Sequence, residues 1–232
     1  METLFNGFTL ALSPGAFPLS TDSMVLADFV RLRPNAGVLD LGSGCGTLGL
    51  LLCAKNESCT VTGIELDPEA HAMALENAAR NGIDRRLGSI CADLRLLPLE
   101  IVPGSFSCCV SNPPYFSGGF ASAAHPLARQ EQACTLRDVF AAASKSLRFG
   151  GDFFLVHKPE RLGELCALGA EFDLIPKVLR LVRHTSGGSV SLLLLQMRKG
   201  AKQGLIFQEE ALRDPEGHPT ADYRRIYHLD EP

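Results

Sequence analysis

Four consecutive residues, Asn112-Pro113-Pro114-Tyr115, have the groups best suited to chemistry. They follow an apolar run at residues 106–110, which predicts a buried strand, so they stand just beyond that strand's carboxyl end. Ligands bind at this edge in open α/β sheets. Two successive prolines remove two N–H donors and prevent a helix from continuing, so the turn is stiff and rich in hydrogen-bond acceptors.

This turn has the groups to bind one flat amine. The side-chain oxygen of Asn112 and the carbonyl oxygen of Pro113 can together accept both hydrogens of an NH2 group, while Tyr115 offers a face for stacking. The sequence therefore predicts a pocket for a planar amide or an exocyclic amine. The alternative is a plain strand-ending turn, which asparagine and proline also favour.

A glycine-rich loop lies upstream of this turn. Residues 38–41 predict a short strand, which is followed by Gly42-Ser43-Gly44-Cys45-Gly46 and a helix to residue 54. Strand, loop and helix in this order open a doubly wound nucleotide-binding sheet. A dinucleotide fingerprint needs a glycine where Thr47 stands, so the spacing disfavours NAD and favours a ligand that has no pyrophosphate.

Acidic residues end the next two predicted strands. Glu65 follows the strand at residues 59–64 and lies 23 positions after Gly42. A carboxylate there can accept hydrogen bonds from both ribose hydroxyls of an adenosine-containing cofactor. Asp93 follows a strand at residues 89–92 and can accept from an adenine amino group. Solvated strand-end acids are the alternative for both residues.

The remaining periodicity predicts the elements that position these residues. Further helices are expected after the capping residues 20–23, over 68–80, and from 159 to about 167. Another helix is expected to begin at the Thr135/Asp138 capping pair and to run up to the glycines at 150–151, with Leu147 on the helix. Further strands are expected at 153–157, 177–182 and 190–197. Residues 116–128 have the composition of a mobile flap, and the last 30 or so residues remain unassigned. The predicted fold class is α/β, a doubly wound Rossmann-like sheet that is mostly parallel, with an antiparallel terminal strand pair and a short N-terminal arm.

Charge is distributed unevenly along the 232 residues, whose net charge is −4. The interval 174–208 contains no acidic residue. Its cationic side chains are Lys177, Arg180, Arg183, Arg198, Lys199 and Lys202. They are expected to form a stripe leading towards Tyr115 that holds a polyanion, with a merely solvated surface as the alternative.

The eight cysteines show no C-x-x-C pair, and most fall within apolar runs. They are therefore expected to be reduced core residues of a cytoplasmic protein, and no metal site is expected. The start of the chain has no basic segment typical of a signal peptide, and no apolar run approaches the roughly 18 residues of a membrane span.

Taken together, these motifs resemble those of the class I S-adenosylmethionine-dependent methyltransferases, with residues 40–46 as the cofactor loop. The Asn-Pro-Pro-Tyr turn resembles that of enzymes which methylate adenine N6 in DNA or RNA, or a protein glutamine. Within that group the chain is similar, over nearly its whole length, to bacterial tRNA (adenine-N6)-methyltransferases acting on valine tRNA. The stretches that carry this similarity downstream are 128–131, 134–136, 156–162, 199–200 and 226–227.

The resemblance implies S-adenosylmethionine as cofactor, N6-methylation of an adenine in the anticodon region of a tRNA, and roles for particular residues. The residues implied in catalysis are Asn112, Pro113 and Tyr115. Those implied in cofactor binding are Asp40, Gly42, Gly44, Gly46, Glu65, Leu66, Asp93 and Asn112. Those implied in substrate binding are Pro114, Phe116, Arg129, Arg180, Arg183 and Lys202.

The expected organisation is an arm and helix at residues 1–36, a cofactor-binding methyltransferase domain at 37–200, and a tail at 201–232 packed on the same domain. A monomer that binds tRNA, without a metal or a membrane, is expected. Protein glutamine methylation is an alternative, although only 37 residues precede Val38, where enzymes acting on release factors carry a helical domain. An RNA-binding protein without catalytic activity is a further alternative.

Overall fold

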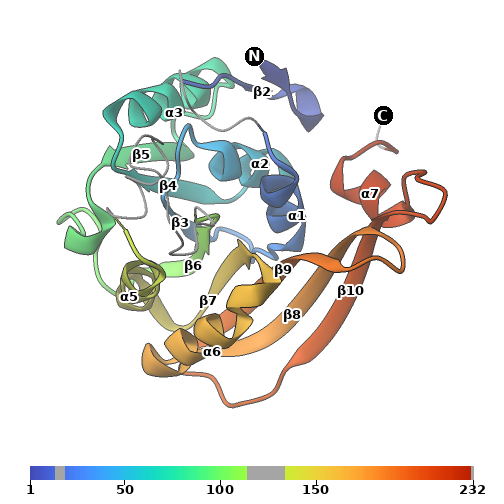
Figure 1. The fold of residues 1–232 in the computed structure, drawn as a ribbon. Helices are drawn as coiled ribbons and strands as arrows, with labels where there is room; N and C mark the ends of the chain where they lie inside the picture. Colours follow the sequence, from blue (N-terminus) through green and yellow to red (C-terminus); the bar gives the residue numbers. More distant parts are fainter. Residues whose placement is uncertain (14–18, 114–133, 231–232) are drawn as a thin grey trace, which may run out of the picture.

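An eight-stranded sheet with the order β10-β8-β9-β7-β6-β3-β4-β5 forms the centre of the computed structural model (Figure 1), which describes residues 1–13, 19–113 and 134–230. Its strands are β3 (Gly37–Leu41), β4 (Thr60–Glu65), β5 (Leu87–Cys91), β6 (Phe106–Ser111), β7 (Leu147–His157), β8 (Leu174–Thr185), β9 (Val190–Lys199) and β10 (Ile206–Arg213). Only β9 runs antiparallel to its neighbours. The predicted doubly wound, mostly parallel sheet with an antiparallel β8–β9 pair is confirmed.

Helices cover both faces of this sheet because its strands alternate apolar side chains between two hydrophobic clusters. Val38 packs into the cluster beneath α1 (Thr21–Phe29), α2 (Thr47–Lys55) and α3 (Pro68–Arg80), whereas Leu39 packs into the cluster beneath α5 (Leu136–Ser146) and α6 (Leu162–Glu171). The short elements are β1 (Glu2–Thr3), η1 (Phe5–Gly7), β2 (Thr9–Leu10), η2 (Leu94–Leu96), η3 (Pro159–Arg161) and α7 (Ala221–Ile226). β1 and β2 pair as a hairpin, as expected for the N-terminal arm.

The predicted capping residues begin their helices. Ser20 caps α1 and Asp67 caps α3, each by accepting a hydrogen bond from a backbone N–H of the first turn. Thr135 and Asp138 form a reciprocal capping box at the start of α5. The expectation that Leu147 belongs to this helix is wrong, because the helix ends at Ser146 and Leu147 instead pairs with Phe106 as the first residue of β7.

The order of the strands reverses between β3 and β6, so the chain leaves these two neighbours towards opposite sides. Their alignment is fixed by the pairing of Asp40 with Val110 and by the Ser111 hydroxyl, which donates to the Leu41 carbonyl oxygen at 2.8 Å. The glycine-rich loop and Asn112 therefore emerge side by side at the carboxyl edge of the sheet. A ligand crevice is expected at such a switch point.

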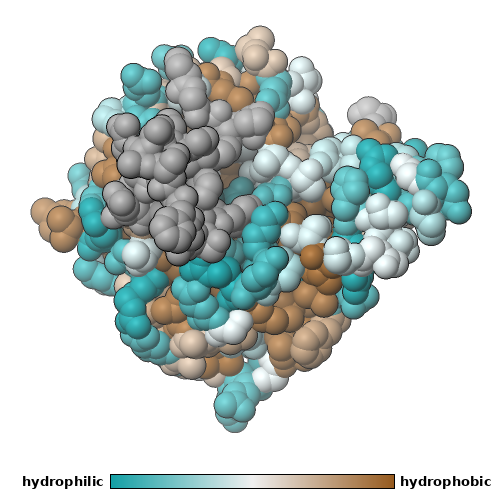
Figure 2. Space-filling view, viewed as in Figure 1, coloured by the Kyte–Doolittle hydropathy of each residue, from teal (hydrophilic) through white to brown (hydrophobic). Residues whose placement is uncertain are grey.

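The C-terminal residues extend the sheet in a way that the sequence pattern does not predict. β10 lies parallel to β8, with Ile206 opposite Val178, and α7 then packs against α1. The Tyr227 hydroxyl donates to Thr21 Oγ1 at 3.2 Å. In the space-filling view, the lobe around α7 and the loop before it is largely hydrophilic (Figure 2).

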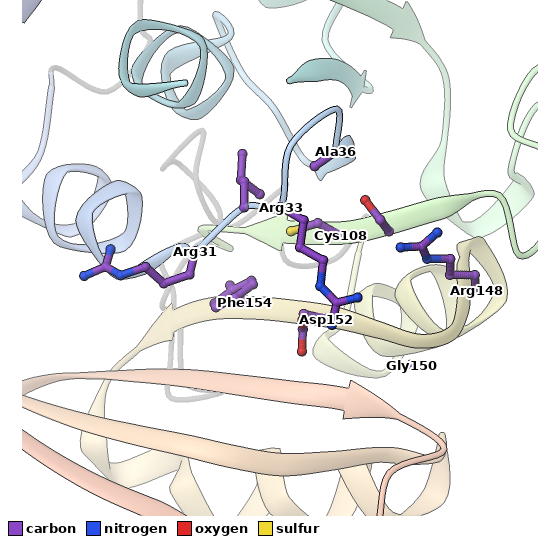
Figure 3. Close-up of a pocket in the computed structure, with 10 residues that line it drawn as sticks. Arg31, Arg33, Ala36, Cys108, Arg148, Gly150, Asp152 and Phe154 are labelled. Atoms are coloured by element: carbon purple, nitrogen blue, oxygen red, sulfur yellow. The ribbon is translucent and has the colours of Figure 1, made fainter. Parts of the chain in front are cut away.

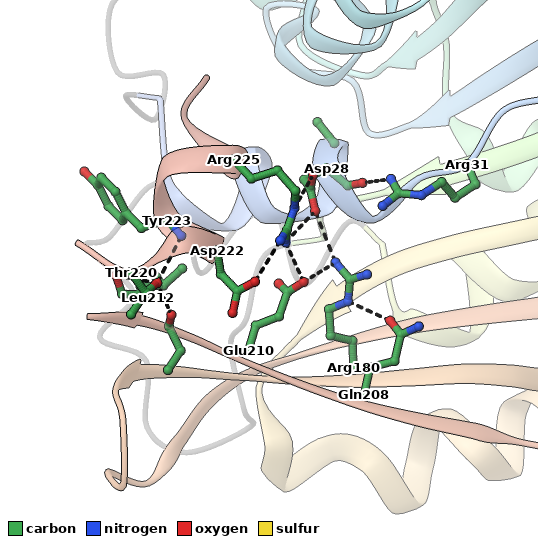
Figure 4. Close-up of polar contacts among 12 residues, drawn as sticks. Asp28, Arg31, Arg180, Gln208, Glu210, Leu212, Thr220, Asp222, Tyr223 and Arg225 are labelled. Carbon is green, nitrogen blue, oxygen red and sulfur yellow. Dashed lines mark hydrogen bonds and ion pairs between the residues drawn. The ribbon is translucent and has the colours of Figure 1, made fainter. Parts of the chain in front are cut away.

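A buried cluster of charges joins this C-terminal lobe to α1 (Figure 4). Arg180 Nη1 lies 2.8 Å from Glu210 and 3.2 Å from Asp28, and Arg225 Nη2 bridges the same two carboxylates at 2.7 and 3.4 Å. The Arg180 guanidinium also lies over the Phe29 ring, 4.8 Å from its centroid. Buried charges are tolerated only when paired. The buried Arg180 has two acidic partners, and the half-exposed Arg225 adds Asp222 to the same two.

Across the residues that the structure describes, no helix has the length and apolar character needed to cross a membrane.

Candidate active site

The loop after β3 lies at the switch point of the sheet and contains three glycines. Gly42, Gly44 and Gly46 have φ angles of +77°, +54° and +80°, a conformation that L side chains rarely adopt. A Cβ atom added at Gly42 or Gly44 would meet no heavy atom of the described residues within 4 Å, whereas at Gly46 it would lie 3.2 Å from Ala74 Cβ. The first two glycines therefore leave room for a ligand, and the third allows α2 and α3 to pack closely.

Glu65 ends β4 and its carboxylate holds the neighbouring loop. Oε2 accepts a hydrogen bond from the Gly44 amide at 2.7 Å, and Oε1 accepts from the Asp67 amide at 2.9 Å. The residue thus lies beside the glycine loop, as its position in the sequence predicts. A carboxylate oxygen can accept more than one hydrogen bond, so the group retains capacity for ligand hydroxyls.

Asp40 is a carboxyl group buried without compensation. It is 1% exposed, and neither of its side-chain oxygens has a hydrogen-bond partner among the described residues. Burial, reinforced by the negative charge of Glu65, raises the pKa of Asp40 to about 7. An uncompensated buried acid beside an open glycine loop is typical of a site whose ligand supplies the missing donor or positive charge.

Asn112 and Pro113 follow β6 at the same edge of the sheet. The Asn112 Nδ2 group donates to the hydroxyl oxygen of Ser23, in the first turn of α1, at 3.1 Å. Asn112 is half-buried and Pro113 is buried. The other candidates in and after this turn, Pro114, Tyr115, Phe116 and Arg129, and the expected flap at residues 116–128, lie outside the described residues.

The remaining two cofactor candidates lie at the ends of β4 and β5. Leu66 is 50% exposed, an unusual degree for a leucine beside a buried sheet edge, and it offers an apolar surface for a ring. Asp93 caps η2, and its carboxylate binds the Arg95 guanidinium, with Oδ2 2.6 Å from Nη2. This hydrogen-bonded pairing lowers the pKa of Asp93 and keeps its carboxyl group charged.

Sequence reasoning missed that Asn77 of α3 and Asn81, which caps the end of α3, hold the N-terminal arm against the loop. Asn77 is fully buried; it exchanges two hydrogen bonds with the Ala11 backbone and donates to the Cys45 carbonyl oxygen at 3.0 Å. Asn81 makes the same two-way exchange with the Thr9 backbone. The spacing of these asparagines by four places them on one helical face, which was a signal available in the sequence.

The predicted basic stripe does not exist. Arg180 is only 7% exposed and is committed to Asp28 and Glu210, so it cannot contact a phosphate from outside. It is buried because its position in β8 faces α1, where it meets the two acids. The interval 174–208 itself contains no acidic residue, and the two acidic partners of Arg180 lie outside it in the sequence.

Strand register separates the other cations of the interval. Arg198 pairs with Asp152, the middle residue of β7, which lies beside Cys108 near the start of β6. Leu193, by contrast, pairs with His157 at the end of β7. Lys199 pairs with the first residue of β8, and Lys202 follows it. Lys199 and Lys202 therefore lie at the edge opposite Asn112, and Arg198 lies five residues, or about 17 Å, from the end of β7.

Of the six cations, Arg183 lies near the carboxyl edge, three residues after Arg180 along β8. Its guanidinium donates to the Gly188 carbonyl oxygen at 2.5 Å and lies 3.7 Å from Glu209. At the amino edge, Lys177 donates to the Lys202 carbonyl oxygen at 3.1 Å. The opposite edge also has a small pocket where Arg33, Cys108 and Asp152 meet (Figure 3), and it is remote from the glycine loop.

A doubly wound sheet with an antiparallel strand inserted beside β7, a glycine loop at its switch point, and an Asn-Pro turn after the next strand define a class I S-adenosylmethionine-dependent methyltransferase. The model of the "Methyltransferase small domain" family matches residues 18–178, and the chain belongs to this family. In the described residues, no group of three or more histidine, cysteine or acidic side chains is arranged to hold a metal.

Similar proteins agree with this assignment. A tRNA1(Val) (adenine(37)-N6)-methyltransferase of Aeromonas hydrophila is 30% identical over 80% of this chain and 78% of the relative. The protein of the same name from Dickeya chrysanthemi is 31% identical over 85% of this chain and 79% of the relative. Among solved structures, a predicted O-methyltransferase of Agrobacterium tumefaciens has a TM-score of 0.74 at 21% identity and covers 90% of this chain and 96% of its own, which shows the shared fold.

Proposed function

We propose that this methyltransferase transfers the methyl group of S-adenosylmethionine to N6 of an adenine in tRNA, and that the target is adenine 37 of a valine tRNA. The observation that carries the proposal is the Asn112-Pro113 turn beside the glycine loop, in a chain that is about 30% identical to proteins named for this activity over four-fifths of its length. A tRNA substrate fits a cytoplasmic enzyme, and we propose that it acts as a monomer.

The residues around the glycine loop fit S-adenosylmethionine. Gly42 and Gly44 give the methionine end access to the backbone, and Gly46 lets α2 and α3 pack closely behind them. The uncompensated Asp40 provides a negative charge for the ammonium group of the methionine end. Glu65 accepts hydrogen bonds from the ribose hydroxyls. For the adenine ring we propose an apolar contact with Leu66 and a hydrogen bond to Asp93, which then shares its carboxylate with Arg95.

The target amine is a poor nucleophile because its lone pair is delocalised into the adenine ring. When bound, S-adenosylmethionine supplies an electrophilic methyl carbon; its sulfur leaves with the bonding electron pair as the thioether of S-adenosylhomocysteine, while the amine nitrogen gains the methyl group and releases one proton. Asn112 Oδ1 and the Pro113 carbonyl oxygen accept hydrogen bonds from the amine and stabilise the positive charge that develops on it. Tyr115 stacks on the base once it has left the RNA stack.

Contacts to the rest of the tRNA are proposed at the carboxyl edge. Arg183 lies there and can reach a phosphate, and Pro114, Phe116 and Arg129 are proposed from their sequence positions to border the base. We no longer propose Lys202 and Arg180 as tRNA contacts. Lys202 lies at the opposite edge of the sheet, and Arg180 is buried.

The proposal is tested by incubating the protein with methyl-labelled S-adenosylmethionine and bulk tRNA from a strain that lacks the gene. Label in N6-methyladenine of a valine tRNA is the expected result. Label in a protein glutamine would show the alternative activity. If tRNA is bound and no label is transferred, the protein binds RNA without catalysis.

A further inference from the structure

The Asn112 carboxamide contacts the Ser23 hydroxyl group in α1. Its Nδ2 donates to Ser23 Oγ at 3.1 Å, across 89 positions of sequence. Ser23 is 7% exposed, so water has little access to compete for this contact. The pairing therefore fixes one end of the Asn112 amide against the first turn of a well-packed helix.

One placement of the hydroxyl protons gives the hydrogen-bond chain from Ser20 to Asn112 a single direction. Ser23 Oγ lies 3.3 Å from Ser20 Oγ, the capping oxygen, which also accepts from the Ser23 backbone N–H at 3.3 Å. A hydroxyl has a single proton. When Ser23 donates that proton to Ser20, its oxygen faces Asn112 as an acceptor and selects the NH2 end of the amide.

The orientation of this amide matters because its two ends have opposite hydrogen-bonding character. With the NH2 end on Ser23, Oδ1 is the end of the amide that does not bind Ser23. An amide turned by 180° would present its NH2 group to the amine of the target base, which would set donor against donor at the point where an acceptor is required.

We propose that Ser23 is a positioning residue that selects the productive orientation of the Asn112 carboxamide. This role rests on the proposed function, in which Asn112 Oδ1 accepts from the target amine. Ser23 touches neither the methyl group nor the base; it acts through Asn112.

The test is a comparison of Ser23→Ala in two backgrounds, measured as single-turnover transfer of labelled methyl to tRNA with enzyme in excess, so that slow variants remain measurable. With Asn112 present, loss of one orienting hydrogen bond is expected to slow transfer about tenfold. Affinity for S-adenosylhomocysteine should stay unchanged. In an Asn112→Asp background, Ser23→Ala should slow transfer less than about twofold, because both carboxylate oxygens accept and neither orientation is wrong.

Ser146 provides the matched control. It is fully buried at the end of α5, and its hydroxyl has no hydrogen-bond partner among the described residues, so Ser146→Ala should leave the transfer rate unchanged. Equal slowing by Ser23→Ala in the parental and Asn112→Asp backgrounds, or no slowing in the parental background, would overturn the role of Ser23. If Asn112→Ala itself keeps the parental rate, the proposed function fails; if it abolishes transfer while Ser23→Ala has no effect, only the role of Ser23 fails.

Discussion

Replacing Asp40 by asparagine should make the protein more stable and less able to bind its cofactor. The Asp40 carboxyl is fully buried without a hydrogen-bond partner in the described residues, and burial together with Glu65 raises its pKa from the usual 3.8 to about 7. Between those two values the folded state holds a proton that the unfolded state has lost. Stability is therefore lost progressively as pH rises from about 4 through about 7.

The size of the effect follows from the two pKa values. A difference of roughly three pKa units corresponds to about 4 kcal/mol of unfolding free energy at pH 8, where the folded protein must hold a buried charge. At pH 5 the folded carboxyl is already neutral, and the cost is about 2 kcal/mol. The asparagine side chain has nearly the same shape and no charge, so the substitution removes this cost.

The assay is urea denaturation of the parent and of Asp40→Asn at pH 5 and pH 8. The advantage of the variant should grow from about 2 to about 4 kcal/mol between these pH values. Calorimetry at pH 8 should show weaker binding of S-adenosylmethionine by the variant, because the charge facing the ammonium group is gone. In the parent, affinity should rise with pH through about 7 as Asp40 becomes charged.

Asp28→Asn is the matched control. Although burial by itself raises the pKa of Asp28, Lys55 and Arg225 hold it below the usual value. Loss of the Asp28 charge should therefore destabilise the protein at pH 8, and this destabilisation should become smaller as pH falls below about 4. An advantage for Asp40→Asn that does not increase between pH 5 and pH 8 would refute the assignment of Asp40 as an uncompensated buried charge.

Three further outcomes are expected. Asn112→Ala should abolish methyl transfer while the affinity for S-adenosylhomocysteine, measured by calorimetry, stays within a few fold; substantial retained turnover would contradict the role of Asn112 Oδ1. Arg180→Ala should lower the unfolding free energy by about 3–5 kcal/mol in denaturant titration, because it leaves Asp28 and Glu210 partly uncompensated beneath the C-terminal lobe; a loss below about 1 kcal/mol would show that these acids are solvated. Arg183→Ala should reduce the slope of log K for tRNA against log salt by roughly 0.7 to 0.9, whereas Lys202→Ala, at the opposite edge, should leave it unchanged; equal slopes in the two variants would exclude a phosphate contact by Arg183.

Short-range patterns in the sequence were enough to predict much of the fold and the main features of the candidate site. The loop at Gly42 to Gly46, the caps at Ser20 and Thr135, and the Asn-Pro turn after β6 each depend on a few adjacent residues. Glu65 could be placed for the same reason, since a strand's end and the edge it reaches follow from the alternation of strands and helices. The resemblance to tRNA methyltransferases rests on these same motifs.

Longer-range arrangements were decided only by the tertiary structure. Arg180 appeared to be part of a basic surface because its partners, Asp28 and Glu210, lie on α1 and β10, and nothing near it in the sequence reveals them. The pairing of Arg198 with Asp152 likewise depends on a register between strands, and register determines the edge at which each cation lies. The contact between Ser23 and Asn112 joins residues 89 positions apart. Local propensity specifies which segments become strands and helices, but the face and the depth at which each side chain lies depend on how those segments pack, which is a property of the whole chain.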